Sequence, residues 1–216
     1  FSISLSVRQK HPGFIYENFI SGYDNINWTQ SLKLVENQSI NLKLSNSVFG
    51  NINFNHSIID NFFYISIDQD SQEIMAPILN QYEGKIKYSS LKLERSFDFG
   101  KWTLHNSIIY QMINQNEDIL NLPQFMSRNT LFFSERIFRN TLAIQTGLNF
   151  KIFSKYYANE YNPLISDFHI QNQKKIGSFP LFDFFFNAKI RQTKIFIIAE
   201  HINSSFTGNN FYSTPE

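Results

Sequence analysis

Apolar and polar residues alternate with a period of two along several segments of this chain. Phe1, Ile3, Leu5 and Val7 alternate with serines and Arg8, and the same alternation returns within 101–113 and 140–154. Successive side chains of a β-strand point to opposite faces, so each segment predicts a strand with one apolar and one polar face. A sheet of many such strands can have lipid on one face and water on the other. The pattern therefore predicts an all-β fold, an antiparallel transmembrane β-barrel with lipid outside and water or a plug inside.

The same pattern places the individual strands and their connections. About ten to twelve strands are expected, the clearest at 1–9, 26–35, 38–46, 48–59, 82–95, 101–113, 125–138, 140–154, 181–191 and 194–203. Short turns are expected at 36–37, 46–47, 98–101, 139–140 and 192–193, and long polar connections at 68–81, 114–124 and 155–180. From residue 82 onward the two kinds alternate, as the short periplasmic turns and long extracellular loops of a barrel do. Before residue 82 two short turns follow one another, and the up-and-down order stays open.

One strand contains a change of phase. Ile86 and Tyr88 share one parity, whereas Leu91 and Leu93 take the other. A β-bulge near Ser89 and Ser90 would keep both pairs facing lipid, so we expect one there. The segment 125–138 alternates weakly, and its faces are not assigned.

Parity then divides the remaining strand residues between two faces. The lipid face is expected to carry Ile40, Leu42, Leu44, Ile52, Phe54, Leu104, Ile108, Leu142, Leu148, Phe182, Phe184, Phe186 and Ile190. The pore lining is expected to include Lys43, Asn53, His105, Gln145, Asn149, Lys151, Asp183, Asn187, Lys189 and Glu200. Trp28, Trp102 and Tyr110 are expected near strand ends, where amphipathic rings settle at the lipid–water boundary. The alternative is a soluble sandwich with one solvated face, but the predicted strands are long for a small sandwich.

Composition excludes several other classes. The chain has 216 residues, 42% of them hydrophobic and 17% aromatic, with a mean hydropathy of −0.28. No run approaches the roughly 18–20 apolar residues of a membrane-spanning helix. The net charge of +1 provides no electrostatic footprint for nucleic acid. Cysteine is absent, which removes disulfides, thiolate metal sites and thiol nucleophiles. We expect one barrel domain over residues 1–216 and, because both ends are abrupt, an internal piece of a longer chain.

The last third of the chain carries a series of short motifs. They are LAIQTG at 142–147, YYA at 156–158, YNP at 161–163, KIGSFP at 175–180 before Asp183, EHIN at 200–203 and FYSTP at 211–215. As a set they resemble the C-terminal half of the Bacteroidetes putative porin family, and the resemblance extends from about residue 14 onward. It implies an outer-membrane β-barrel of a Gram-negative cell. It brings no catalytic residue, cofactor or established solute, and the family's closing strand after the last proline has no counterpart here.

Candidate chemistry is sparse. His105 and Ser107 share a face, as a Ser–His hydrolase would need, but nothing nearby orients the histidine. No histidine has metal-ligand spacing, so no metal and no cofactor are expected. Interior charge leans positive, which predicts a weak anion preference in a pore. Opposite charges on the last two strands, from Asp183 to Glu200, are expected to pair across their hairpin.

These observations favour a porin-like channel, not an enzyme, for passive diffusion of small polar solutes or ions through the outer membrane. The loop 155–180 would fold inward as a constriction or outward as a binding surface. The alternative is a plugged or closed barrel that serves as a structural or docking subunit of a larger assembly. Expected partners are outer-membrane lipid and either other outer-membrane proteins or further copies of the chain, with no nucleic acid. A soluble carbohydrate-binding β-protein is a third alternative.

Overall fold

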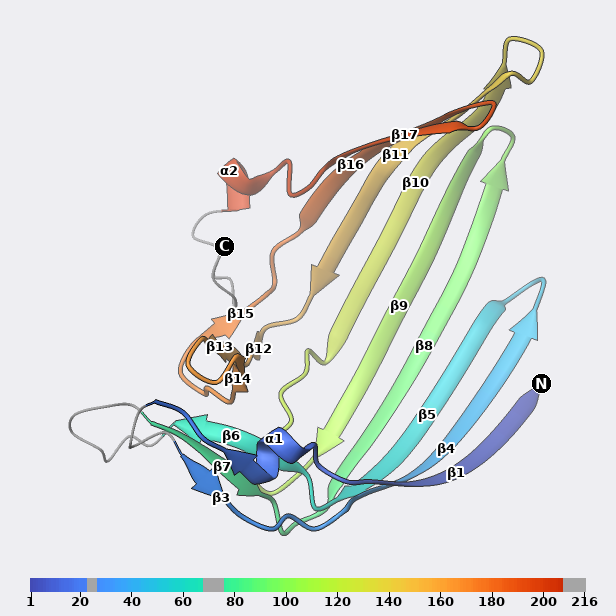
Figure 1. Ribbon diagram of the computed structural model, residues 1–216. Coiled ribbons are helices and arrows are strands. Elements are labelled where there is room, and N and C mark those ends of the chain that lie inside the picture. Colours follow the sequence, from blue (N-terminus) through green and yellow to red (C-terminus); the bar gives the residue numbers. More distant parts are fainter. Residues whose placement is uncertain (23–26, 68–75, 208–216) are drawn as a thin grey trace.

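The computed structural model describes residues 1–22, 27–67 and 76–207. The motif at 211–215 and most of the predicted connection at 68–81 lie outside these ranges. Nine long strands hydrogen-bond side by side in one antiparallel sheet, in the order β1-β4-β5-β8-β9-β10-β11-β16-β17 (Figure 1). Their bounds are Ser2–Lys10 (β1), Val35–Asn46 (β4), Gly50–Asp60 (β5), Ile86–Phe99 (β8), Trp102–Asn114 (β9), Phe125–Ile137 (β10), Leu142–Phe153 (β11), Leu181–Ile190 (β16) and Thr193–Ala199 (β17). The all-β antiparallel class predicted from the alternation is confirmed.

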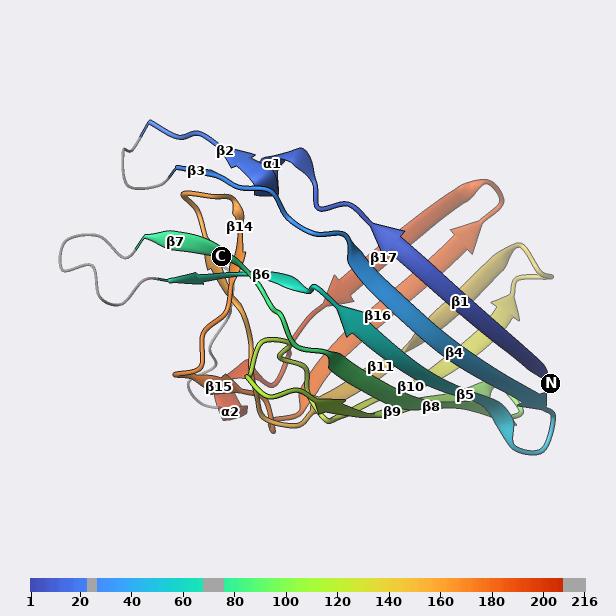
Figure 2. The ribbon, with the colours of Figure 1, turned by 90° about the horizontal axis from the view of Figure 1, so that it is seen from below.

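The sheet is curved. Seen from two directions, it forms a trough whose two rims are β1 and β17 (Figures 1 and 2). Among the described residues β1 pairs with β4 and β17 pairs with β16, so the sheet remains open between the rims. Such curvature follows from the right-handed twist of neighbouring strands.

Connections between the nine strands alternate strictly between short and long. Residues 47–49, 100–101, 138–141 and 191–192 are short turns at one end, and 11–34, 61–85, 115–124 and 154–180 are long connections at the other. The order left open before residue 82 is thereby settled. The predicted strand at 26–35 is wrong, because the described part of that range contains only Trp28–Thr29 (β3), which pairs outside the main sheet, and the first residue of β4. The predicted turn at 36–37 lies inside β4.

Small elements from the long connections gather at one end of the trough (Figures 1 and 2). We call the described residues of these four connections the loop layer. It contains the short helix α1 (Phe14–Glu17) and four two-stranded sheets: β2 (Asn18–Phe19) with β3, β6 (Phe63–Ile67) with β7 (Pro77–Gln81), β12 (Tyr156–Tyr157) with β15 (Lys175–Ile176), and β13 (Glu160–Asn162) with β14 (Asp167–His169). A second short helix, α2 (Ser204–Thr207), follows β17. Neither helix is long and apolar enough to cross a membrane, and the described residues contain no other.

The predicted β-bulge in β8 does not occur. Ser89 and Ser90 pair in unbroken register with β5 and with β9. Ile86 therefore stays on the same face as Lys92, where it is fully buried (0% exposed) against Tyr82 and Ile119 of the loop layer. Ile86 is apolar although it lies on the polar face of β8. It is accommodated there because the loop layer covers this end of the strand.

Buried apolar residues gather in two clusters at the loop end. One consists of Leu32, Ile65, Leu79 and Ile165, with Tyr16, Phe19, Trp28 and Phe63 packed around it. The other consists of Tyr82, Ile86 and Ile119, with Ile59, Phe62, Tyr64, Ile113 and Leu120 around it. The loop layer thus has a hydrophobic core of its own and is a packed structure.

Candidate functional site: the polar face of the sheet

The two faces of the sheet are exposed in the opposite way to those of a soluble protein: the apolar face is exposed and the polar face is the more buried one. Leu5 is 74% exposed, Leu91 38% and Leu148 44%, whereas Gln111 and Asp183 on the opposite face are 5% and 4% exposed. Side chains converge on the concave side of a curved sheet and diverge on the convex side. The more buried polar face is therefore the concave one, and the apolar face is presented to the surroundings.

The thirteen residues that parity assigned to the lipid face all lie on this apolar face in the strand register, whereas Ile86 and Tyr88, expected to face lipid through a bulge, lie on the polar face. Aromatic residues mark both ends of it: Phe99 pairs with Trp102 at the turn end, and Tyr110 pairs with Phe125 at the loop end. Trp102 and Tyr110 thus lie near strand ends as predicted. Trp28 does not lie near an end of a long sheet strand. It belongs to β3 in the loop layer, where it stacks on Phe19 with ring centroids 4.6 Å apart.

The residues expected to line a pore share the polar face, with one exception. Cross-strand register aligns them through neighbouring pairs such as Lys43 with Asn53 and Asn149 with Asp183. The set on this face is Lys43, Asn53, His105, Gln145, Asn149, Lys151, Asp183, Asn187 and Lys189. Glu200 is the exception: it follows the last residue of β17, lies outside the strand ladder and is exposed.

Hydrogen bonds and ion pairs connect neighbouring strands across the polar face. The Lys151 ammonium lies 2.5 Å from the nearly buried Asp183 carboxylate on the next strand, which also accepts a bond from the His201 backbone. Thr130 donates to Asn149 at 2.7 Å, and further bonds join Asn187 to Gln145 and Asn41 to Asn53. The ion pairing predicted within the last hairpin is wrong, because Asp183 pairs backward with β11 and the register of β16 with β17 sets Lys189 opposite Lys194.

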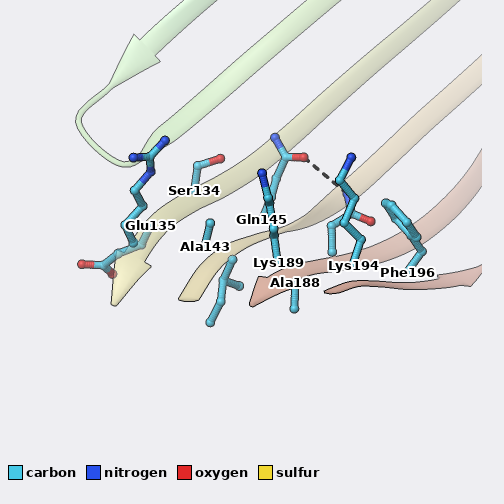
Figure 3. A pocket seen from close by; sticks show the side chains of 11 residues that line it. Ser134, Glu135, Ala143, Gln145, Ala188, Lys189, Lys194 and Phe196 are labelled. Carbon is cyan, nitrogen blue, oxygen red and sulfur yellow. Dashed lines mark hydrogen bonds between the residues drawn. The ribbon is translucent and has the colours of Figure 1, made fainter. Parts of the chain in front are cut away.

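Three cations lie in one cross-strand row at the turn end of the polar face. We call Arg136, Lys189 and Lys194 the basic row, because Arg136 pairs with Ala143, Ala143 with Lys189, and Lys189 with Lys194. In Figure 3 the side chains of Gln145, Lys189 and Lys194 project to the same side, into a hollow of about 450 Å³. Glu135, the one acidic residue among the described residues that line this hollow, is on the apolar face and pairs with Lys101. Within the described ranges the basic row has no ion pair.

Arg136 and Lys194 were not among the expected pore residues. Arg136 was missed because 125–138 alternates weakly: Ser127 and Asn129 lie on its apolar face. The face on which Arg136 lies follows only from the pairing of β10 with the neighbouring strands. The alternation within a single strand does not reveal it.

The connection 154–180 folds across the loop end of the trough. Tyr16, which follows β1, donates to Asp167 at 2.7 Å, and Ile170 donates its backbone N–H to Ile65 at 2.8 Å. Asn121 donates to Asn172 at 3.1 Å. Segments that follow opposite sides of the sheet are therefore joined directly, as Figure 2 shows for β14 beside β6. Of the two alternatives for this loop, the structure has it folded across the trough.

Four titratable groups of the loop layer have shifted pKa values, and burial is the largest cause that raises the pKa of two of them, Tyr64 and Tyr156. The hydrogen bond to Asp167, burial and the charge of that carboxylate raise the pKa of Tyr16 to about 12. Burial lowers the pKa of His169, and Glu160, 3.7 Å from its ring nitrogen, opposes this shift.

His105 and Ser107, the candidate hydrolase pair, do not contact each other as a Ser–His hydrolase would need. His105 has its Nδ1 2.9 Å from Ser96 Oγ on the neighbouring strand, so its local partner is not Ser107. In the part of the chain that the structure describes, no group of three His, Asp or Glu side chains could hold a metal ion.

Comparison with known proteins gives one family. The family model described as "Putative porin" matches residues 1–216. The chain belongs to the putative porin family. This membership implies a porin-like role at the outer membrane. No curated protein matches the chain.

Proposed function

We propose that this chain forms the wall of an outer-membrane channel through which small polar solutes and ions diffuse passively. The observation that carries the proposal is the reversed amphipathicity of the sheet, with exposed Leu91 and Leu148 on one face and buried, hydrogen-bonded Asp183 on the other. Hydrocarbon would solvate the first face, and the second would contact water. In a bilayer every backbone group must be paired, so the proposal requires that the free edges of β1 and β17 also be paired there.

The polar face supplies the proposed lining of this channel. Lys43, Asn53, His105, Gln145, Asn149, Lys151, Asp183, Asn187 and Lys189 would present amide, imidazole and charged groups to passing solutes. Glu200, beyond the end of β17, is proposed at its margin.

We further propose a preference for anions, set by the basic row at the turn end. Basic rings in a pore lower the energy of a passing anion and raise that of a cation. The double variant Lys189→Gln with Lys194→Gln removes two charges of the row, and Lys155→Gln in the loop layer is its matched control. In a salt gradient the reversal potential of the double variant should move toward the cation side relative to the control. An unchanged potential would remove the basic row from the selectivity of the channel.

One observation favours a second candidate function. The loop layer is packed around two hydrophobic clusters and joins segments from opposite sides of the trough through Tyr16 and Asp167. A barrel whose lumen is covered at one end by the loop layer would act as a structural or docking subunit of a larger outer-membrane assembly.

Planar-bilayer conductance of the purified protein separates the two candidates. Discrete conductance steps are expected for the channel. Absence of steps from protein that is folded and inserted would contradict the channel and favour the closed barrel.

A further inference from the structure

A cavity of about 260 Å³ lies in the loop layer, and none of its described lining residues belongs to the nine long strands of the sheet. Its walls come from four segments far apart in the chain: α1, residues 62–65, residues 119–122 and residues 159–170. At about 30 Å³ per water molecule, it has room for roughly nine. This is slightly below the range of about 300–1,000 Å³ for sites that hold drug-sized ligands, so a smaller molecule fits.

Aromatic rings make up much of the cavity wall. Tyr16, Phe62, Phe63, Tyr64 and Phe168 all line it. The rings of Tyr16 and Phe63 are 4.7 Å apart, and Phe168, 41% exposed, is not completely packed by its neighbours. The face of an aromatic ring carries partial negative charge and attracts cations within about 6 Å.

The polar groups of the wall are also suited to positive charge. Asp167 is the one charged residue among the described residues that line the cavity. A ligand that carries N–H or N–CH₃ groups with positive charge would be attracted by this carboxylate.

We propose that this cavity binds a small organic cation, an amine or quaternary ammonium compound. The site is separate from the channel function and does not depend on it. Aromatic residues and one carboxylate line it from three of the four segments, and no lysine or arginine of the described wall opposes positive charge. The negative field of Asp167 that keeps the Tyr16 phenol protonated also favours a cation here.

Trp28 provides a direct reporter of binding. Its indole nitrogen donates to the backbone oxygen of Tyr16, 3.0 Å away, so its environment follows α1. The chain contains two tryptophans, and Trp102→Phe leaves Trp28 as the only one. We would titrate this variant, purified in detergent, with tetramethylammonium chloride and choline chloride, against sodium chloride at equal ionic strength. The neutral isostere of choline, 3,3-dimethylbutanol, controls for shape. A saturable fluorescence change is expected with both cations and not with sodium chloride or the isostere.

Two further variants separate charge from structure. Asp167→Asn removes the carboxylate charge and keeps an oxygen that can accept from Tyr16, whereas Tyr16→Phe removes the hydrogen bond and keeps the charge. Asp167→Asn should weaken cation binding at least about tenfold, whereas Tyr16→Phe should leave it within about threefold.

Three results would overturn the proposal. Equal binding of 3,3-dimethylbutanol or of glucose would make the cavity a site for neutral ligands. A loss of affinity in Tyr16→Phe as large as that in Asp167→Asn would show that the charge of Asp167 is not what binds the cation. Absence of any saturable change would show that the cavity does not bind these cations.

Discussion

Replacement of Leu148 by arginine tests which face of the sheet contacts lipid. Leu148 lies near the middle of β11 (Leu142–Phe153), on the apolar face between Leu131 and Phe184. If this face is in hydrocarbon, the arginine should lower the free energy of unfolding by about 2–4 kcal/mol. If the face is in water, an exposed substitution at a residue that is 44% exposed should cost about 0.5 kcal/mol.

The neighbouring residue is the matched control. Asn149 lies on the polar face and accepts a hydrogen bond from Thr130, so Asn149→Arg should cost about 1 kcal/mol through the loss of this bond. Both variants would be folded into lipid vesicles and unfolded with guanidinium chloride, with tryptophan fluorescence as the signal. A cost for Leu148→Arg that is no larger than that for Asn149→Arg would refute the assignment of the faces.

Three further predictions use the same unfolding assay or a variant of it. Lys151→Ala leaves the Asp183 side chain, 6% exposed, without its cation, and should cost about 1–3 kcal/mol because Lys151 itself is partly solvated; a neutral result would mean that the pair does not stabilise the sheet. Gly147→Ala should cost about 1–3 kcal/mol, since a Cβ there would lie 2.3 Å from the Leu131 carbonyl oxygen, and wild-type stability would show that the strands can separate to admit it. The pKa of His169 is lowered by burial, so the unfolded chain binds a proton before the folded one and the loop layer should lose stability as pH falls below about 6.5. Hydrogen exchange of the loop layer at pH 7 and pH 5 measures this, and His169→Gln should remove the dependence; an unchanged dependence would assign it to another group.

The faces of the sheet could be predicted because parity is a local property. Once a strand exists, every second side chain shares a face, and the unbroken register of β11 with β16 places Asn149 beside Asp183 as the alternation implied. Glu200 was expected on the polar face, but in the structure it lies beyond the end of β17 and outside the strand register. The ends of strands depend on tertiary packing more than on the local sequence pattern.

The errors in strand assignment come from the loop layer. Ile86 was assigned to lipid through a bulge, but Ile119 from a connection far along the chain buries it on the polar face. Trp28 and its neighbours resembled a wall strand, but packing around Leu32 and Ile65 holds them in a small separate sheet. Contacts between connections far apart in sequence decide both cases, and no pattern within one segment records them.

The orientation of the two faces is tested most directly by site-directed spin labelling along β11 in lipid vesicles. The chain has no cysteine, so single cysteines at Leu148, Asn149, Phe150 and Lys151 can be labelled specifically. The expected result is a period of two: labels at 148 and 150 collide with lipid-soluble oxygen, and labels at 149 and 151 collide with a water-soluble nickel chelate. Access of the nickel chelate to all four positions alike would contradict a sheet with one face in lipid.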